Sequence, residues 1–464
     1  MMLAAELRRF CRHRVNLWVL AAFAVVVTLG ALASGLAATE HRRAVVAQQE
    51  RWAAEVAATR VALLLEGLSD IPADGAKRAM TAFSLGRHDD AVAHLPAREG
   101  LALSVRQFDR LSPELRVSVE SRHSDARKND VLTNPLLDGM GALDFATLIA
   151  LLLPLALIGL IFGLVHEDRE QGIWRLVCVQ SGKVGALVLI GLAIRAASVA
   201  AIVAAGSVLV FALDSGSSLH ALFTWLAVVL AYTLCWTAWL AACLLLPVSS
   251  GTSTLAMLGL WLMLTFAVPG VLASVADRQS PMPSRLDAIF QMREAQQQAE
   301  VDMDALVAEW YRQHPEAAEV ASRPHTWPMT FVPRFLAQDR QVRPLMRQFD
   351  AARARQVDML ESHAWLSPPL AMLLAADRLA GIDAPRYLRY VDAVNAFEDE
   401  WRGFLVPRIM AYRGLDAADL DRLPVFGLAE DDTVRWPPSL WGMLAVALAG
   451  WAIFGVGRRA LGRP

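Results

Sequence analysis

Long uncharged runs alternate with polar stretches along the 464 residues of this chain. A helix needs roughly twenty apolar residues to cross the hydrocarbon core of a membrane. Runs of that kind predict six membrane-spanning helices. They cover residues 15–38, 145–165, 184–213, 221–246, 254–276 and 436–457. The fourth and fifth runs form one stretch without charged residues, which we divide at the turn-rich sequence 246–252.

The polar stretches predict two large insertions between the spans. In the first insertion, Val45, Trp52, Val56 and Leu63 mark one face of a helix over 40–68. The other elements expected are strands at 103–105 and 116–120 and helices at 284–311, 345–364, 370–380 and 385–404. The predicted fold class is an all-α membrane protein with two mainly helical extracytoplasmic insertions and minor β structure in the first. A core shared by both insertions is a further hypothesis.

Basic residues near the ends of the spans predict the orientation of the chain. Lysine and arginine in short flanks favour the cytoplasmic side. These residues precede the first span, follow the second and follow the sixth: Arg8, Arg9, Arg12 and Arg14; Arg169, Arg175 and Lys183; Arg458, Arg459 and Arg463. With six alternating spans the three flanks lie on one side, so we expect both termini in the cytoplasm. Four residues near span ends are expected to be interfacial aromatics: Trp18, Trp225, Trp436 and Trp441.

These boundaries divide the chain into consecutive parts. They are an amphipathic segment and the first span (1–38), the first periplasmic insertion (39–143), the second span (144–165), a cytoplasmic segment (166–183), spans three to five (184–276), the second periplasmic insertion (277–435), and the sixth span with its tail (436–464). The sequence 31–33 resembles a small-residue cleavage site. A cleaved signal peptide is therefore the alternative to a retained first span.

Composition narrows the class of protein. The chain is 55% hydrophobic and only 19% charged, which fits a membrane protein better than a soluble one. Its net charge of −2 gives no support for binding to nucleic acid. All cysteines lie in or beside the hydrophobic runs: Cys11, Cys178, Cys235 and Cys243. A disulfide framework is therefore excluded from the insertions.

The cytoplasmic segment begins with the sequence HEDREQGIWRL, residues 166–176, directly after the second span. Its charged residues precede Gly172, and the apolar Ile173, Trp174 and Leu176 follow it. Glycine permits a tight bend between two helical pieces. We expect the segment to leave the span, turn at Gly172 and lie along the membrane surface. The alternative is an interfacial helix with no partner.

The sequence from Asp168 to Gly172 resembles the acidic-Arg-Glu-x-Gly-Thr-Leu signature of type-2 ABC transporter permeases. In that family the signature follows the second span and forms a coupling helix that docks on the ATP-hydrolysing subunit. Ile173 and Trp174 replace the usual Thr and Leu. Further short sequences resemble a subgroup with large periplasmic insertions: Asn134–Pro135, Gly141–Asp144, Pro283–Arg285, Arg293–Ala295, His314–Pro315, Trp365, Ser367–Pro368 and Gly381.

The resemblance implies a non-catalytic membrane subunit of an ATP-driven transporter, an exporter of the bacterial inner membrane. It implies separate ABC-type ATPase subunits that hold ATP and Mg, and a second permease copy or paralogue in a dimer. No cofactor, metal or catalytic residue is expected on this chain, and Ser181–Lys183 lacks the pattern of a phosphate-binding loop. The docking residues implied are Glu167, Asp168, Arg169, Glu170, Gly172, Trp174 and Arg175.

The main alternative function is a membrane-anchored periplasmic assembly or interaction protein without transport activity. In either case the insertions are candidate contacts for a periplasmic protein. The sequence contains no nucleophile elbow and no His-Glu-x-x-His motif that would indicate an enzyme.

Three further features are candidate sites. Arg195 lies inside the third span, where we expect it to reach the membrane surface or to pair with another subunit; a direct transport role is the alternative. Residues 88–94 carry histidine and aspartate that could bind zinc or copper, although a solvated surface explains them better. Pro154 and Pro269 lie inside spans and could kink them or free backbone carbonyls.

Overall fold

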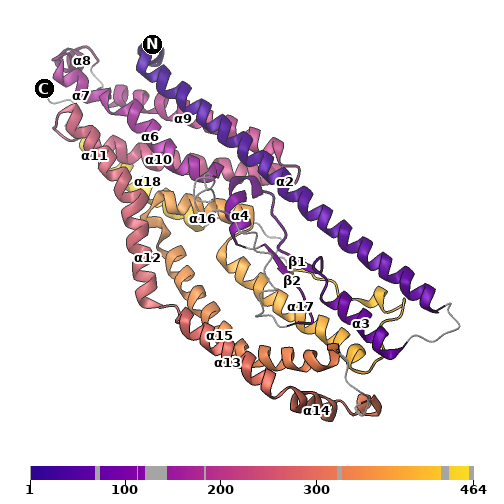
Figure 1. Cartoon of the computed structure of the whole chain (residues 1–464). Helices are drawn as coiled ribbons and strands as arrows, with labels where there is room; N and C mark the ends of the chain where they lie inside the picture. The colour runs from indigo at the N-terminus through magenta and orange to yellow at the C-terminus, as the bar shows by residue number, and fades with distance from the viewer. Residues whose placement is uncertain are drawn as a thin grey trace.

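The computed structural model describes residues 2–67, 74–111, 113–120, 144–181, 184–320, 327–429 and 438–458. Nearly all of these residues are helical (Figure 1). Within these ranges six helices are long and apolar enough to cross a membrane, as the hydrophobic runs predicted. They are Arg14–Glu66, Phe145–Glu170, Val184–Leu213, Leu219–Cys243, Ser250–Gln279 and Leu440–Gly457. The chain is therefore a multi-pass, all-α membrane protein.

The spans form a bundle in which α2 packs on α9 and α6, and α10 packs on α18 and α9. The elements are α1 (Met2–Arg12), α2 (Arg14–Gly67), α6 (Phe145–Ile161), α7 (Gly163–Glu170), α8 (Trp174–Ser181), α9 (Val184–Leu213), α10 (Leu219–Cys243), α11 (Ser250–Leu262), α12 (Val268–Gln279) and α18 (Pro438–Gly457). Small residues allow close packing. A Cβ added to Gly206 of α9 would lie 2.5 Å from the side chain of Val27 on α2.

The first span does not end where the hydrophobic run ends. α2 continues from Arg14 to Gly67 without a break, so the helix extends well past residue 38, where the hydrophobic run ends. The sequence after it is rich in Ala, Gln, Glu and Arg, which favour helix and so extend it. The predicted face marked by Trp52 and Val56 is the half-buried one, as expected. Ala31 and Val27 of this helix are fully buried in the bundle.

The fifth span contains a wider helical turn. A π-helical turn at Met263–Ala267, labelled η3, joins α11 to α12 and is followed by Pro269. Proline has no N–H, so it cannot bond to a carbonyl of the preceding turn. The carbonyl of Leu264 instead accepts a hydrogen bond of 2.6 Å from the Oγ of Ser367. The Leu264 carbonyl is therefore bonded and does not line an open path, whereas α6 continues through Pro154.

Both polar segments build one extramembrane domain, at the opposite end of the bundle from α7 and α8 (Figure 1). Its elements are α3 (Gly75–Gly86), β1 (Val92–His94), η1 (Leu101–Leu103), α4 (Val105–Arg110), β2 (Glu114–Arg116), α13 (Arg285–Val301), α14 (Met303–Gln313), η4 (Pro315–Val320), α15 (Trp327–His363), η5 (Ala364–Leu366), α16 (Pro368–Ala380), α17 (Ala384–Met410) and η6 (Leu420–Arg422). The two segments share one core, as hypothesised, because α17 of the second segment packs on α3 of the first and bonds to β1. The hydroxyl of Tyr390 on α17 donates to the carbonyl of Ala93 on β1.

Buried polar side chains of α17 fasten the two segments together. The indole N–H of Trp401 donates to the carbonyl of Gly86 at 3.2 Å, and the Nε of Arg402 donates to the carbonyl of Ser118 at 3.0 Å. Arg402 is also ion-paired with Asp339 of α15 inside the domain. These bonds satisfy buried backbone groups that would otherwise have no partner.

The short elements of the first segment were predicted less well. The strand expected at 103–105 is wrong, because η1 and α4 occupy that region. β1 pairs antiparallel with β2, with Val92 opposite Arg116, so Arg116 is the only part of the strand expected at 116–120 that forms. Minor β structure in this segment is nevertheless confirmed.

In the second segment the helix boundaries differ from those predicted. The helix expected over 284–311 is divided at Asp302 into α13 and α14, and α15 begins at Trp327 and continues through Pro333 and Pro344. Gly381 ends α16 in a left-handed conformation, with φ of 84°, as expected of a helix C-terminus. Several positions discussed above lie outside the described residues: Asn134–Pro135, Gly141, Gly182, Lys183, Trp436, Arg459 and Arg463.

One predicted interfacial aromatic is instead a core residue. Trp225 is fully buried, and its indole N–H donates to the Oγ of Ser207 at 3.0 Å. Trp18 and Trp441 are exposed near the ends of their spans, as predicted. A tryptophan near a span end thus faces either lipid or core, and the sequence alone did not separate the two.

Candidate functional site

The segment after the second span folds as two short helices with a sharp turn between them. α7 ends at Glu170, Gly172 adopts a left-handed conformation with φ of 73°, and α8 begins at Trp174. The expected bend at Gly172 is confirmed. We call residues 163–181 the elbow. It lies at the end of the bundle where α1 begins and where Arg458, at the end of α18, approaches Gly185 of α9.

An ion pair fastens the elbow to the N-terminal helix. One terminal nitrogen of Arg9, Nη2, lies 2.8 Å from each carboxylate oxygen of Asp168, and the Asp168 side chain is largely buried. Burial lowers the pKa of Arg9, but the hydrogen bond and charge of Asp168 outweigh it and hold that pKa above its usual value. The Arg9 guanidinium therefore stays charged at every physiological pH.

A second contact fastens the elbow to the fifth span. The carboxylate of Glu170 accepts hydrogen bonds of 2.7 Å from the backbone N–H and 2.8 Å from the Oγ of Ser250. Ser250 is the first residue of α11, where unpaired N–H groups and the helix dipole favour a negative charge. The Nε2 of His166 lies 3.1 Å from the carbonyl of Leu246 in the same connection. The elbow and the connection between the fourth and fifth spans are thus in direct contact.

The face of α8 that points away from the bundle is partly apolar. Ile173, Leu176 and Val179 are exposed, Leu176 at 56% and Val179 at 82%, and the exposed Arg175 lies among them. Trp174 points inward and is buried, with the guanidinium of Arg169 5.6 Å from its ring centroid. Apolar side chains exposed beside a basic one are typical of a surface that contacts protein or lipid headgroups.

The predicted docking residues therefore separate into two groups. Asp168, Glu170 and Trp174 each contact other parts of the chain; Asp168 and Trp174 are buried, whereas Glu170 is exposed. Glu167 is half-buried, and its carboxylate lies against Gly163 one turn earlier. Arg175 remains on the outward face, where sequence reasoning had missed Leu176 and Val179.

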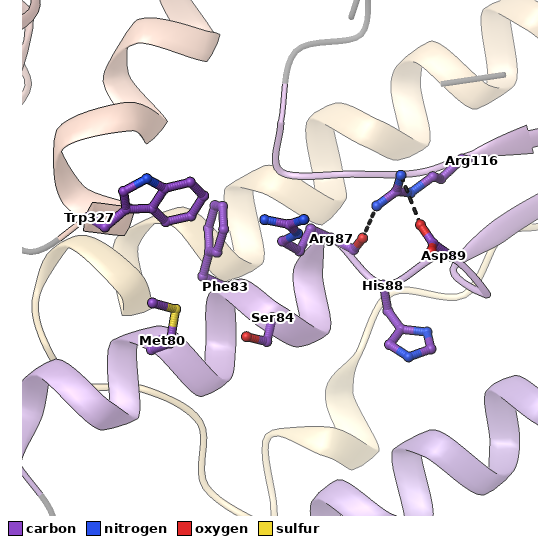
Figure 2. Close-up of a pocket in the computed structure, with 8 residues that line it drawn as sticks. All are labelled: Met80, Phe83, Ser84, Arg87, His88, Asp89, Arg116 and Trp327. Carbon is purple, nitrogen blue, oxygen red and sulfur yellow. Dashed lines mark hydrogen bonds and ion pairs between the residues drawn. The ribbon is translucent and has the colours of Figure 1, made fainter. Parts of the chain in front are cut away.

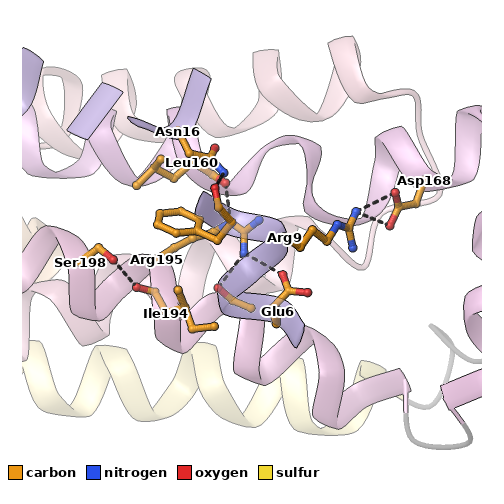
Figure 3. Close-up of polar contacts among 10 residues, drawn as sticks. Glu6, Arg9, Asn16, Leu160, Asp168, Ile194, Arg195 and Ser198 are labelled. Atoms are coloured by element: carbon orange, nitrogen blue, oxygen red, sulfur yellow. Dashed lines mark hydrogen bonds and ion pairs between the residues drawn. The ribbon is translucent and has the colours of Figure 1, made fainter. Parts of the chain in front are cut away.

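A buried charge cluster extends from the N-terminal helix into the third span (Figure 3). The Nη1 of Arg195 lies 3.3 Å from the Oε1 of Glu6 and donates to the carbonyl of Gly191 at 2.9 Å. Its Nε donates to the carbonyl of Leu160 on α6 at 2.7 Å. Both Arg195 and Glu6 are buried. Arg195 thus pairs within its own chain, contrary to the expectation that it reaches the surface or a second subunit.

The N-terminal helix α1 joins the two charge contacts. Glu6 and Phe10 face α9, where the Arg195 guanidinium carbon lies 5.4 Å from the Phe10 ring centroid, while Arg9 reaches α7. The spacing of three and four residues among Glu6, Arg9 and Phe10 places them on neighbouring faces of one helix. That spacing is the signal in the sequence that could have identified α1 as part of the site.

The remaining candidates do not converge on a site. His88 is half-exposed, with Glu55 at 3.8 Å and Asp90 at 3.9 Å, and His94 lies 3.7 Å from Glu114. Within the ranges that the structure describes, no three His, Cys, Asp or Glu side chains gather as metal ligands. Residues 88–94 therefore form a partly exposed turn and strand.

Comparison with known proteins adds one finding. A family described as "Domain of unknown function (DUF3526)" matches residues 285–429, which is less than a third of the chain. The match begins at α13 and ends after η6, so it covers the second segment of the extramembrane domain. No curated protein and no solved structure matches the chain.

Proposed function

We propose that this chain is the membrane-spanning subunit of an ATP-driven ABC transporter. In this proposal it is an exporter of the bacterial inner membrane, with both termini and the elbow in the cytoplasm and the extramembrane domain in the periplasm. ATP and Mg are held by separate ATPase subunits, and a second permease copy or paralogue completes the dimer. The resemblance of Asp168–Gly172 to the permease signature motivates it, and the geometry of the elbow supports it.

The main support for the proposal is that the first helix of the elbow is bonded to other helices of the chain, whereas the second helix exposes apolar side chains. Asp168 and Glu170 fix its first helix to α1 and α11. The second helix, α8, presents Leu176, Val179 and Arg175 outward. A segment that couples an ATPase to the spans needs both properties. If it were held loosely, a movement of the ATPase would displace the segment without moving the spans. An interfacial helix without a partner would not need the two anchors.

The anchors define how a displacement would spread. A push on α8 moves α7, and Glu170 carries the movement to the start of α11. Arg9 carries it to α1, which grips α9 through the Glu6–Arg195 pair. The second, third and fifth spans, which contain α7, α9 and α11, would therefore respond together to one force at the elbow. Packed elements with discrete contacts of this kind transmit small shifts over long distances.

The fifth span is the surface on which we expect the second permease. Only 11% of the most apolar 18-residue stretch of this span is buried inside the chain, against 61% for the fourth span. Leu255, Leu262 and Phe266 are among its exposed residues. In the proposed dimer this surface is shared between the second subunit and lipid, which both accept apolar side chains.

Leu176→Glu tests the docking role of α8, with Leu286→Glu as the matched control on the exposed side of α13. Each variant is co-expressed with candidate ABC-type ATPases from the source organism and purified from membranes. We expect Leu176→Glu to weaken ATPase binding about 5- to 30-fold, because loss of a central apolar contact costs roughly 1–2 kcal/mol. The control should retain wild-type binding.

Two results would count against the proposal. If no ABC-type ATPase binds the wild-type chain, the alternative of a periplasmic assembly or interaction protein is favoured. If an ATPase binds equally well to both variants, the chain is a transporter subunit whose docking surface lies elsewhere than α8.

A further inference from the structure

A cavity of about 290 Å³ opens between the two segments of the extramembrane domain (Figure 2). We propose that it binds an organic carboxylate with an aromatic or aliphatic body, such as an apolar amino acid derivative or the carboxyl end of an apolar peptide. Its walls come from α3, β2 and the first turn of α15. Clefts between packed units are frequent ligand sites. This proposal does not depend on the transporter assignment.

One wall of the cavity is aromatic. The rings of Phe83 and Trp327 meet edge to face, with centroids 4.9 Å apart and an interplanar angle of 81°. Phe83 is buried and holds the position, whereas Trp327 is 43% exposed and presents its ring to the cavity (Figure 2). Met80, on the same side, is also exposed. Exposed Trp and Met side chains on a rigid backing are suited to bind apolar ligand groups.

The cavity also contains a positively charged side chain, that of Arg87. It is the C-cap residue of α3, and its guanidinium carbon lies 5.7 Å from the Phe83 centroid and 5.9 Å from the Trp327 centroid. Among the described residues, the carboxylate nearest to Arg87 is that of Glu120, at 3.5 Å, and 44% of the Arg87 side chain is exposed. A guanidinium has five N–H donors, so this long contact leaves capacity for another anion.

The second arginine of the cavity, Arg116, bonds to the backbone of Arg87. Arg116 on β2 donates to the backbone carbonyl of Arg87 and pairs with Asp89 at 2.9 Å (Figure 2). Its side chain is only 10% exposed, so it adds positive potential but little contact area. Arg116 thereby fixes the backbone from which Arg87 extends.

The distances select the class of ligand. Because one guanidinium lies within 6 Å of both rings, a single small molecule can place its carboxylate on Arg87 and its apolar group against Trp327. Arginine binds carboxylates through two parallel hydrogen bonds. A doubly charged phosphate is disfavoured because Glu120 and Asp89 already lie beside the two arginines. A ligand without negative charge would form no ion pair with the exposed guanidinium of Arg87.

The experiment compares N-acetyl-phenylalanine with N-acetyl-phenylalaninamide, which differ only in the negative charge. Binding to the full-length chain in lipid nanodiscs is measured by saturation-transfer NMR and calorimetry. We expect the acid to bind with at least tenfold higher affinity than the amide. Arg87→Gln should abolish that difference, and Arg87→Lys should restore only part of it, because lysine lacks the planar fork. Arg353→Gln, an exposed arginine farther along α15, is the control.

A tripeptide ending in phenylalanine distinguishes the two sources of the carboxylate. Tighter binding of the tripeptide acid supports recognition of a peptide end, and tighter binding of the single residue supports a small-molecule ligand. Equal affinity for acid and amide, or no binding of either probe at millimolar concentration, overturns the proposal. The comparison of acid with amide uses the wild-type chain, so the result does not depend on how a variant folds.

Discussion

Arg9 and Asp168 are far apart in the sequence, and a single guanidinium nitrogen joins both carboxylate oxygens at 2.8 Å. The contact fastens the helix that precedes the first span to the helix that follows the second. Asp168 is largely buried, whereas 46% of the Arg9 side chain is exposed. The pair is therefore better shielded from solvent than a surface ion pair, which contributes about 0–1 kcal/mol.

We predict that exchange of the two charges preserves the contact. Arg9→Asp and Asp168→Arg alone should each lower ATPase stimulation in the assembled complex, because the elbow loses its hold on α1. The double variant should recover part of the activity, with a coupling energy of about 1 kcal/mol or more between neighbouring sites. Arg8→Asp, on an exposed neighbouring position, is the control. Additive effects of the two single variants would show that the pair has no part in coupling.

The Glu6–Arg195 pair leads to a prediction about stability. Both side chains are almost fully buried, at 4% and 7% exposure, so removing one leaves the other as an uncompensated charge. Glu6→Gln should destabilise the protein by about 3–5 kcal/mol, whereas Glu6→Gln with Arg195→Met should cost less. Thermal unfolding in detergent, followed by circular dichroism, measures both. A double variant less stable than Glu6→Gln alone would contradict this account.

Ser367 provides a test of how the domain is joined to the fifth span. Its Oγ donates to the Leu264 carbonyl at 2.6 Å and accepts from the N–H of Leu370 at 3.3 Å, so it caps α16 as well. Ser367→Ala should destabilise the protein by about 1–3 kcal/mol, because a helix cap and a buried carbonyl lose their partner together. Ser367→Thr keeps the hydroxyl and should retain most of the stability. Ser362→Ala, at a more exposed serine, should be neutral in the same unfolding measurement.

The sequence predicted the membrane part of the fold well, for a physical reason. Twenty apolar residues have few alternatives to a spanning helix, so the run at 184–213 became α9 with the same limits. Outside the membrane the same reasoning was weaker. Leu103–Val105 alternates like a strand, but a helix begins at Val105, and its first N–H groups bond to Asp144, which is distant in the sequence. The N–H groups of Arg106 and Gln107 donate to that carboxylate at 3.0 and 3.1 Å.

The candidate site was predicted in position but not in its contacts. Gly172 could be identified because a left-handed turn between two helical pieces favours glycine. The partners of Asp168 and Glu170 could not, since Arg9 and Ser250 are distant in sequence and common in type. Arg195 illustrates the same limit. A charge inside a span must find a partner, but the identity of Glu6 follows only from the packing of α1 on α9.

Two buried carboxylates near the junction of the domain with the membrane predict a pH dependence. Burial raises the pKa of Asp144 to about 6 and that of Asp377 to about 7, against about 4 in the unfolded chain. The folded state therefore binds more protons between pH 4 and 7, so its stability should fall as pH rises through that window and level off above it. Asp377→Asn should raise stability at pH 8 by about 1–3 kcal/mol and flatten the dependence. Thermal unfolding of nanodisc samples from pH 4 to 8 measures this, with the exposed Asp304→Asn as control; an unchanged slope in Asp377→Asn would refute it.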